Sequence, residues 1–103
     1  MGLSYAEAVQ ITRLNKVYKI QMTGAAIQLS TVITDTNIKA ICINNADSGN
    51  GVVRWAHVAA DIDTEGYPIA EEKEYAFETD GVDDVYVYGT DTKYIYVHVA
   101  SHG

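Results

Sequence analysis

The residues in this sequence whose types and spacing could do chemistry are four carboxylates near the middle of the chain. Asp61, Asp63, Glu65 and Glu72 fall at the first, third, fifth and twelfth places of a stretch whose sixth place is glycine. Calcium loops place oxygen ligands at these places, and the glycine makes their sharp turn. Pro68 and the strand-forming residues on both sides do not fit the helices that flank such loops. We therefore expect a solvated acidic loop, with these four side chains as a secondary candidate for a divalent-cation site.

Other residue types that carry chemistry are scattered along the chain. Cys42 is the sole cysteine and lies in an apolar run, which predicts a small buried thiol and allows no disulfide within the chain. The histidines, His57, His98 and His102, have no converging third ligand in the sequence. The chain has no Gly-x-Ser-x-Gly turn, and no phosphate-binding glycine loop leads into a helix. We expect neither an enzyme nor a cofactor-binding protein.

Length, composition and charge limit the remaining classes. A chain of 103 residues with 48% apolar residues fits one folded domain. Fourteen acidic against seven basic residues give a net charge of −7, which repels nucleic acid and anionic membranes. The acidity serves either solubility or attachment to a basic surface. Since no signal peptide or membrane span is recognisable, we expect a protein made and kept in the cytosol, or in a particle assembled there.

Strand signals dominate the chain after residue 16. β-branched and aromatic residues run in short segments broken by Gly, Asn, Asp and Thr, and this pattern predicts an all-β sandwich or barrel of about seven strands. The expected strands cover residues 17–23, 26–31, 37–44, 52–58, 73–78, 84–88 and 93–100. We divide the chain into an N-terminal arm, 1–16, and a β-sandwich domain, 17–103. Ser4 and Glu7 could cap a short helix in the arm, or the arm could be extended and order only on contact with a neighbour.

The last two expected strands alternate aliphatic residues with tyrosines. We expect them to pair as a hairpin whose core face carries Val85, Val87, Ile95, Val97 and Val99. The opposite face would carry Tyr86, Tyr88, Tyr94 and Tyr96. Such a face either forms a ladder capped by water or is covered by another chain. Trp55 is expected either to fill the core between two sheets or to anchor a contact with a partner.

The layout of these elements resembles that of small head proteins of tailed phages. The resemblance rests on the Ile-x-Leu-Ser stretch within residues 23–30, the Ile-x-Ile-x-Asn stretch within 38–45, and the tyrosine-rich stretches 85–90 and 94–97. It spans roughly residues 20–100. The acidic stretch 61–72 departs from the family, which often has an apolar turn with Pro and Gly before its fifth strand.

The resemblance implies a virion decoration or cement protein with a β-sandwich, often jelly-roll-like, fold. Such a protein would be a non-enzymatic component of the capsid surface, made in the host cytoplasm, that binds assembled shell subunits and stabilises them. The implied partners are the major capsid protein or another virion protein, together with further copies of the chain in a dimer or trimer. The arm would lie across a capsid subunit or a sister chain, and the residues expected at protein contacts are Trp55, Tyr86, Tyr88, Tyr94 and Tyr96.

Two other functions fit the sequence. A carbohydrate-binding, lectin-like sandwich would use Trp55 and exposed tyrosines as stacking platforms, with the acidic stretch holding calcium. A head–tail or tail adaptor would share the fold and differ in its place on the particle.

Overall fold

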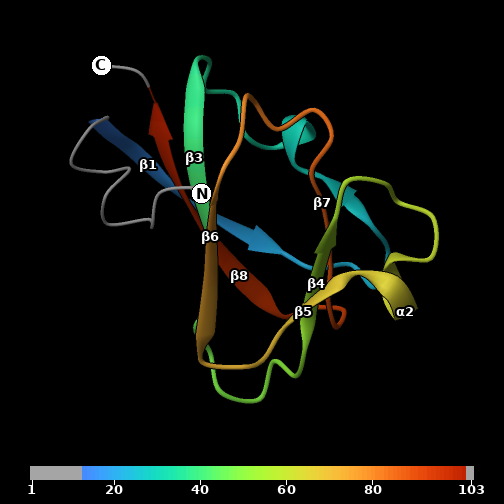
Figure 1. Cartoon of the computed structure of the whole chain (residues 1–103). Helices are drawn as coiled ribbons and strands as arrows, with labels where there is room; N and C mark the ends of the chain where they lie inside the picture. The colour runs from blue at the N-terminus through green and yellow to red at the C-terminus, as the bar shows by residue number, and fades with distance from the viewer. Residues whose placement is uncertain (1–12, 102–103) are drawn as a thin grey trace.

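The protein is a sandwich of two antiparallel four-stranded sheets (Figure 1). The computed structural model describes residues 13–101, with side chains from residue 16 onward. Sheet A has the strand order β1 (Arg13–Gln21), β8 (Tyr94–Ser101), β3 (Ile38–Asn45) and β6 (Lys73–Glu78). Sheet B has the order β2 (Ile27–Gln28), β7 (Tyr86–Tyr88), β4 (Val53–Ala56) and β5 (Tyr67–Ile69). Two short helical turns, η1 (Leu29–Thr31) and α2 (Ile62–Glu65), complete the described elements. The all-β sandwich predicted from the sequence is confirmed.

The strand order follows from folding the chain as one long double ribbon. The first four strands pair with the last four in reverse order, so that β1 meets β8, β2 meets β7, β3 meets β6 and β4 meets β5, all antiparallel. Rolling this ribbon brings β3 beside β8 and β4 beside β7, which completes the two sheets. An eight-stranded sandwich wound in this way has the jelly-roll topology.

The core lies between the inner faces of the two sheets. Aliphatic side chains at alternate positions of β3 and β8 point into it, as the period of a β-strand requires. The five aliphatic residues predicted for the core all have 0% exposure: Val85, Val87, Ile95, Val97 and Val99. They join a cluster that also contains Leu29, Ile41, Ile43 and Val53.

The predicted hairpin between the last two strands is wrong. β7 pairs with β2 and β4 in sheet B, whereas β8 pairs with β1 and β3 in sheet A. The connection between them crosses from one sheet to the other at Gly89, where a side chain would meet Met22 at 2.8 Å. Alternation along a strand sets which residues face the core, but the choice of partner strand depends on residues far away in sequence.

Several elements differ from the expected ones, and three of the differences matter for the fold. β5 lies inside the stretch 61–72, which was expected to be an irregular acidic loop; Pro68 fits because β5 is an edge strand. The expected strand 26–31 is a two-residue strand followed by the turn η1. β1 begins at Arg13, so part of the predicted arm 1–16 belongs to sheet A.

Residues 1–12 and 102–103 lie outside the described residues, and with them the predicted helix around Ser4 and Glu7 and the histidine His102. Within residues 13–101, no helix is both long enough and apolar enough to cross a membrane.

Candidate functional site: the aromatic edge

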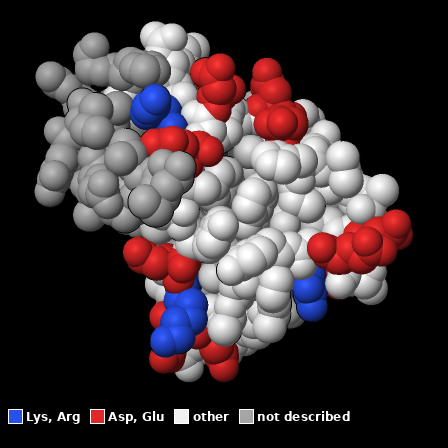
Figure 2. All heavy atoms as spheres, in the orientation of Figure 1, with Lys and Arg blue, Asp and Glu red and all other residues white. Residues whose placement is uncertain are grey.

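The two sheets meet at one open edge, where β6 ends sheet A and β5 ends sheet B. These two edge strands contact each other although they do not pair. Figure 2 shows a broad uncharged area between β6 and β4, with acidic and basic side chains at its margins. Uncharged areas rimmed by charged groups are typical of protein contact surfaces. We refer to this region as the aromatic edge, after the four rings that fill it: Trp55, Tyr67, Tyr75 and Phe77.

Trp55 is the centre of the aromatic edge. Its indole stacks on the Phe77 ring, with centroids 4.2 Å apart and planes inclined by 12°. The rings of Tyr75 and Tyr67 lie 5.9 Å and 6.5 Å from it. Since Trp55 comes from β4 of sheet B, and both Phe77 and Tyr75 come from β6 of sheet A, these contacts join the two sheets. Trp55 thus fills the space between the sheets, one of its two expected roles.

The Nε1 atom of Trp55 is buried and finds no hydrogen-bond partner among the described residues. A buried N–H without an acceptor costs about 1–3 kcal/mol relative to one that is satisfied. The stacking with Phe77 occupies a face of the indole, which leaves less of the ring for a sugar or another ligand. Trp55 is therefore suited to holding the edge together more than to touching a partner directly.

Tyr67 is the ring of the aromatic edge that faces solvent. It is 51% exposed, although its ring lies 4.5 Å from that of Tyr75. A large ring held by neighbours but open to water loses little conformational entropy on binding, and such tyrosines are common at protein contacts. The sequence reasoning missed Tyr67 because it lies next to Pro68 in a stretch expected to be a loop.

The four predicted contact tyrosines lie on two separate surfaces. Tyr86 and Tyr88 alternate with the core residues Val85 and Val87, so they face outward from sheet B, the sheet whose strands β4 and β7 contact α2. Tyr94 and Tyr96 alternate with core residues of β8 and face outward from sheet A. The Nζ atom of Lys19 lies 4.5 Å from the centre of the Tyr94 ring, a cation–π contact. The structure does not bring the four rings together as one face.

The four carboxylates of the candidate cation site are also separated. α2 places Asp63 and Glu65 on one exposed turn, and Asp61 precedes it in a left-handed conformation with φ of 59°. Glu72 follows β5, which runs between it and that turn. Within residues 13–101, no group of three or more His, Cys, Asp or Glu side chains is arranged to hold a metal ion. The stretch therefore forms a helical turn and a strand and lacks the geometry of a calcium loop.

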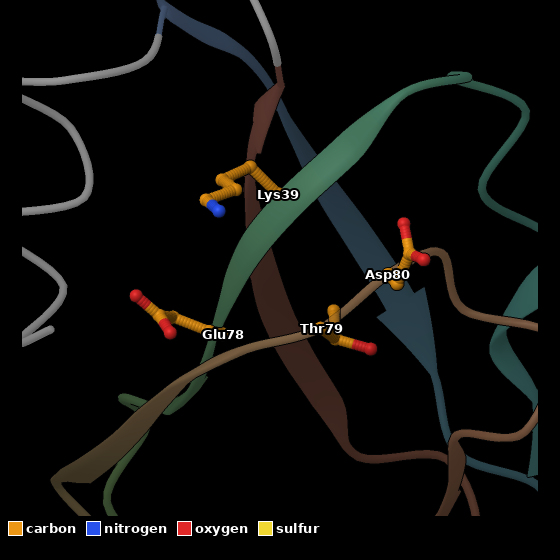
Figure 3. A pocket seen from close by; sticks show the side chains of 4 residues that line it. All are labelled: Lys39, Glu78, Thr79 and Asp80. Carbon is orange, nitrogen blue, oxygen red and sulfur yellow. The ribbon is translucent and has the colours of Figure 1, made fainter. Parts of the chain in front are cut away.

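Two of the hollows on the described surface have charged residues in their lining. One, of about 400 Å³, lies beside Lys39, Glu78, Thr79 and Asp80 (Figure 3). The other, of about 430 Å³, is lined in part by Asp35, whose Oδ1 accepts a 3.1 Å hydrogen bond from the Tyr18 hydroxyl. The Oδ2 atom of Asp35 is buried without a partner in the described residues. The first of these hollows has a mostly polar lining, unlike the apolar walls of typical small-molecule sites.

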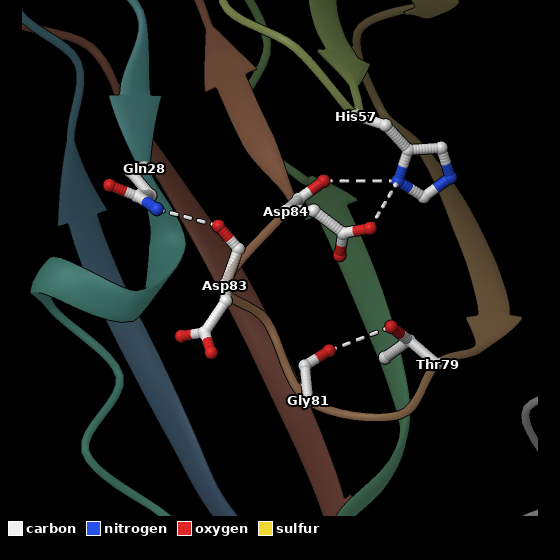
Figure 4. Close-up of polar contacts among 6 residues, drawn as sticks. All are labelled: Gln28, His57, Thr79, Gly81, Asp83 and Asp84. Atoms are coloured by element: carbon white, nitrogen blue, oxygen red, sulfur yellow. Dashed lines mark hydrogen bonds and ion pairs between the residues drawn. The ribbon is translucent and has the colours of Figure 1, made fainter.

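A polar contact network holds the loop between β6 and β7. Gln28 donates a 2.6 Å hydrogen bond to the backbone oxygen of Asp83 (Figure 4). The Nδ1 atom of His57 lies 3.0 Å from the backbone oxygen of Asp84. The carboxylate of Asp84 lies 3.6 Å from the same ring nitrogen. The side chains of His57 and Asp84 are more than half exposed, so this pair contributes little to the stability of the fold.

Cys42 is buried, as predicted, and its thiol is kept protonated. Burial raises the pKa of Cys42 to about 12, and the negative charge of Glu74 and a hydrogen bond with it add to the effect. A thiol reacts as a nucleophile in its ionised form, so this environment disfavours nucleophilic chemistry at neutral pH.

Comparison of the chain with family models, curated proteins and solved structures found no match.

Proposed function

We propose that this protein is a non-enzymatic decoration protein that binds the assembled capsid of a tailed phage, alone or as the dimer or trimer that the resemblance implies. The partner would be the major capsid protein or another virion protein at the capsid surface. The jelly-roll sandwich is consistent with this proposal, since viral capsid domains often have that topology. Fold alone does not establish a function, because lectins share the same topology.

The observation that carries the proposal is the aromatic edge, where the half-exposed Tyr67 of the edge strand β5 contacts the ring of Tyr75 on the edge strand β6. Contact surfaces between proteins concentrate their binding energy in a few aromatic residues surrounded by groups that exclude water. The lectin alternative gains no comparable support, because the acidic stretch lacks the geometry of a calcium loop and Trp55 is stacked on Phe77.

The mechanism would be thermodynamic. A protein that binds the assembled shell but not free subunits shifts the equilibrium toward assembly by mass action, and the shift grows with the ratio of its free concentration to its Kd. A rigid sandwich suits this role, because little order has to be gained on binding.

The proposal can be tested with empty shells of the phage whose genome encodes the chain. We expect the full-length protein to sediment with assembled shells but not with free capsid subunits, and to raise the melting temperature of the shells in calorimetry. Tyr67→Ser should weaken binding by about thirtyfold, the effect of losing about 2 kcal/mol at an aromatic anchor.

Two matched variants identify the binding surface. Tyr94→Ser and Tyr86→Ser make the same change on the outer faces of sheets A and B, and each should alter the Kd by less than about threefold. A larger loss in either one would move the contact surface to that sheet face and refute the aromatic edge. Failure of the unaltered protein to bind shells would refute the decoration function itself.

A further inference from the structure

The two sheets differ in how their edge strands are protected against pairing with another chain. Sheet B ends in β2, which has two residues, and in β5, which has three residues with Pro68 in the middle. Short edge strands and edge prolines discourage such pairing. Sheet A ends in β1 and β6, which have nine and six residues and contain no proline. Within residues 13–101, each of these two strands pairs on one side only, so its outward backbone groups face a side where no described strand lies.

The two edges of sheet A carry opposite charges. Residues 13–21 contain three basic side chains and no acidic one, whereas residues 71–80 contain five carboxylates and one lysine. Lys19 on β1 and both Glu74 and Glu78 on β6 are exposed. The edges of this sheet are therefore complementary to each other, and neither is complementary to itself.

These charges also lie on the same face of the sheet. Lys19 precedes Ile20, which is buried in the core, so the lysine is on the outer face of sheet A. Glu74 and Glu78 alternate with the two aromatic residues that β6 packs against the core, so both carboxylates are on the outer face as well.

The directions of the strands allow the two edges to meet. Neighbours in sheet A are antiparallel throughout, so β1 and β6, with two strands between them, run in opposite directions. A second copy in the same orientation, placed beside β6, presents its β1 antiparallel to that strand. The outer faces of the two sheets are then continuous, which brings the basic edge of one copy to the acidic edge of the next.

One register of this pairing fits both faces of the joined sheet. After its bulge, β1 has six regularly paired residues, 16–21, which is the length of β6. The register places Lys19 of one copy opposite Ala76 of the next. The ammonium group then lies diagonally across from Glu74 and Glu78, within reach of a long side chain. On the inner face, the two residues that flank the lysine come opposite the two aromatic residues of β6, which gives two apolar cross-strand pairs.

We propose that copies of this protein join sheet A edge to edge, with β1 of one copy pairing with β6 of the next. Pairing of β6 with β6 would set carboxylates against carboxylates, and pairing of β1 with β1 would set lysines against lysines. The contact is heterologous, so its repetition gives a ring or an open chain. The inference is independent of the decoration function, and it does not use Tyr67, which belongs to sheet B.

The unaltered chain allows a direct test without shells, by analytical ultracentrifugation and hydrogen exchange at rising protein concentration. We expect the mean mass to rise above that of the monomer in the micromolar to millimolar range. Amides of residues 17–21 and 74–78 that point away from sheet A should then exchange at least about tenfold more slowly. A monomer at every concentration, or protection confined to other strands, would overturn the proposal.

Reversing the charges of either edge gives a second test. Lys19→Glu should weaken association at least about tenfold, and so should Glu74→Lys combined with Glu78→Lys, because each change sets like charges against each other. An equimolar mixture of the two variants should associate as the unaltered protein does, since every contact between unlike chains again joins opposite charges. A mixture that stays monomeric, with the Trp55 emission of both variants unchanged, would refute the pairing.

The matched controls change the net charge by the same amounts away from both edges. Lys93→Glu lies in the turn before β8, and Asp63→Lys with Glu65→Lys lies on α2. Both controls should associate within about twofold of the unaltered protein. Losses as large as those of the edge variants would show that net charge, and not the pairing of β1 with β6, governs association. If an edge variant unfolds, hydrogen exchange of the unaltered chain decides the question.

Discussion

At the scale of single residues, the Cys42 thiol makes the stability of the protein depend on pH in the alkaline range. Burial, first, and then the charge of Glu74 and a hydrogen bond with it raise the pKa of Cys42 from 9.0 to about 12 in the folded protein. As the pH rises past 9, the unfolded chain therefore loses this proton before the folded chain does. The contribution of Cys42 to the unfolding free energy is complete below pH 9 and falls by about 1.4 kcal/mol per pH unit up to the folded pKa.

This prediction can be measured by urea denaturation of the unaltered protein and of Cys42→Ala between pH 8 and pH 11. The Ala variant removes the thiol while leaving the tyrosines and lysines that also titrate there, so the difference between the two proteins isolates Cys42. We expect the unaltered protein to lose more stability than the variant as the pH rises. Parallel pH profiles would mean that the thiol ionises as easily in the folded protein as in the unfolded one.

Burial at single positions could be predicted where the local pattern is unambiguous. Val87 lies in a strand that alternates valine with tyrosine, and Cys42 lies in an apolar run between two isoleucines; both are buried. Tyr67 could not be recognised in this way, because its neighbour Pro68 and the surrounding carboxylates suggested a loop. The stacking of Trp55 on Phe77 joins residues of two sheets that are 22 positions apart, and no local pattern encodes such a contact.

At the scale of elements, a buried asparagine ties the end of β3 to a loop and to β5. Asn45 is 0% exposed, and its amide group donates to the backbone oxygens of Gly51 and Ile69 at 2.8 Å and 3.0 Å. Its side-chain oxygen accepts a 2.8 Å hydrogen bond from Asn50. Asn45→Ala should lower the unfolding free energy by about 2–4 kcal/mol, because three polar partners would be left unsatisfied.

The adjacent Asn44→Ala provides the control. Asn44 is only partly buried and makes one long contact, 3.5 Å, with Glu74, so its loss should cost less than about 1 kcal/mol. Chemical denaturation of both variants gives the comparison. Equal destabilisation would show that the buried network does not hold these elements together.

Most strands, but not their partners, could be predicted from the sequence. The expected strand 73–78 coincides with β6, because alternating charged and aromatic residues between turn residues define its ends. The sequence did not predict β5, because three residues with a proline in the middle are too few to show the alternation of a strand. The pairing of β7 with β2 and β4 depends on how the whole ribbon rolls, so the predicted hairpin with β8 was wrong for a reason that no single element contains.

At the scale of the whole molecule, the jelly roll separates the surfaces on which a partner could bind. Rolling the ribbon places β5 and β6 at one open edge, and it puts the tyrosines of β7 and β8 on opposite outer faces. The sequence suggested one tyrosine face because it could not show this separation. In the structure the candidate site is therefore an edge centred on Trp55 and Tyr67, and the expected face of four tyrosines does not form. The residues of this edge come from both sheets.

The net charge of −7 should govern how fast the protein finds its proposed partner shell, and Tyr67 how long it stays. Raising NaCl from about 50 to 500 mM should slow association about tenfold or more if the shell presents a basic surface, because salt screens long-range attraction. The dissociation rate should hardly change, whereas Tyr67→Ser should raise it, since buried anchors act mainly on dissociation.

A double variant of exposed carboxylates, Asp63→Asn with Glu65→Gln, should weaken the salt dependence of association while leaving dissociation unchanged. Surface plasmon resonance on immobilised shells measures both rates, and association that is indifferent to salt would assign the acidity of the chain to solubility alone.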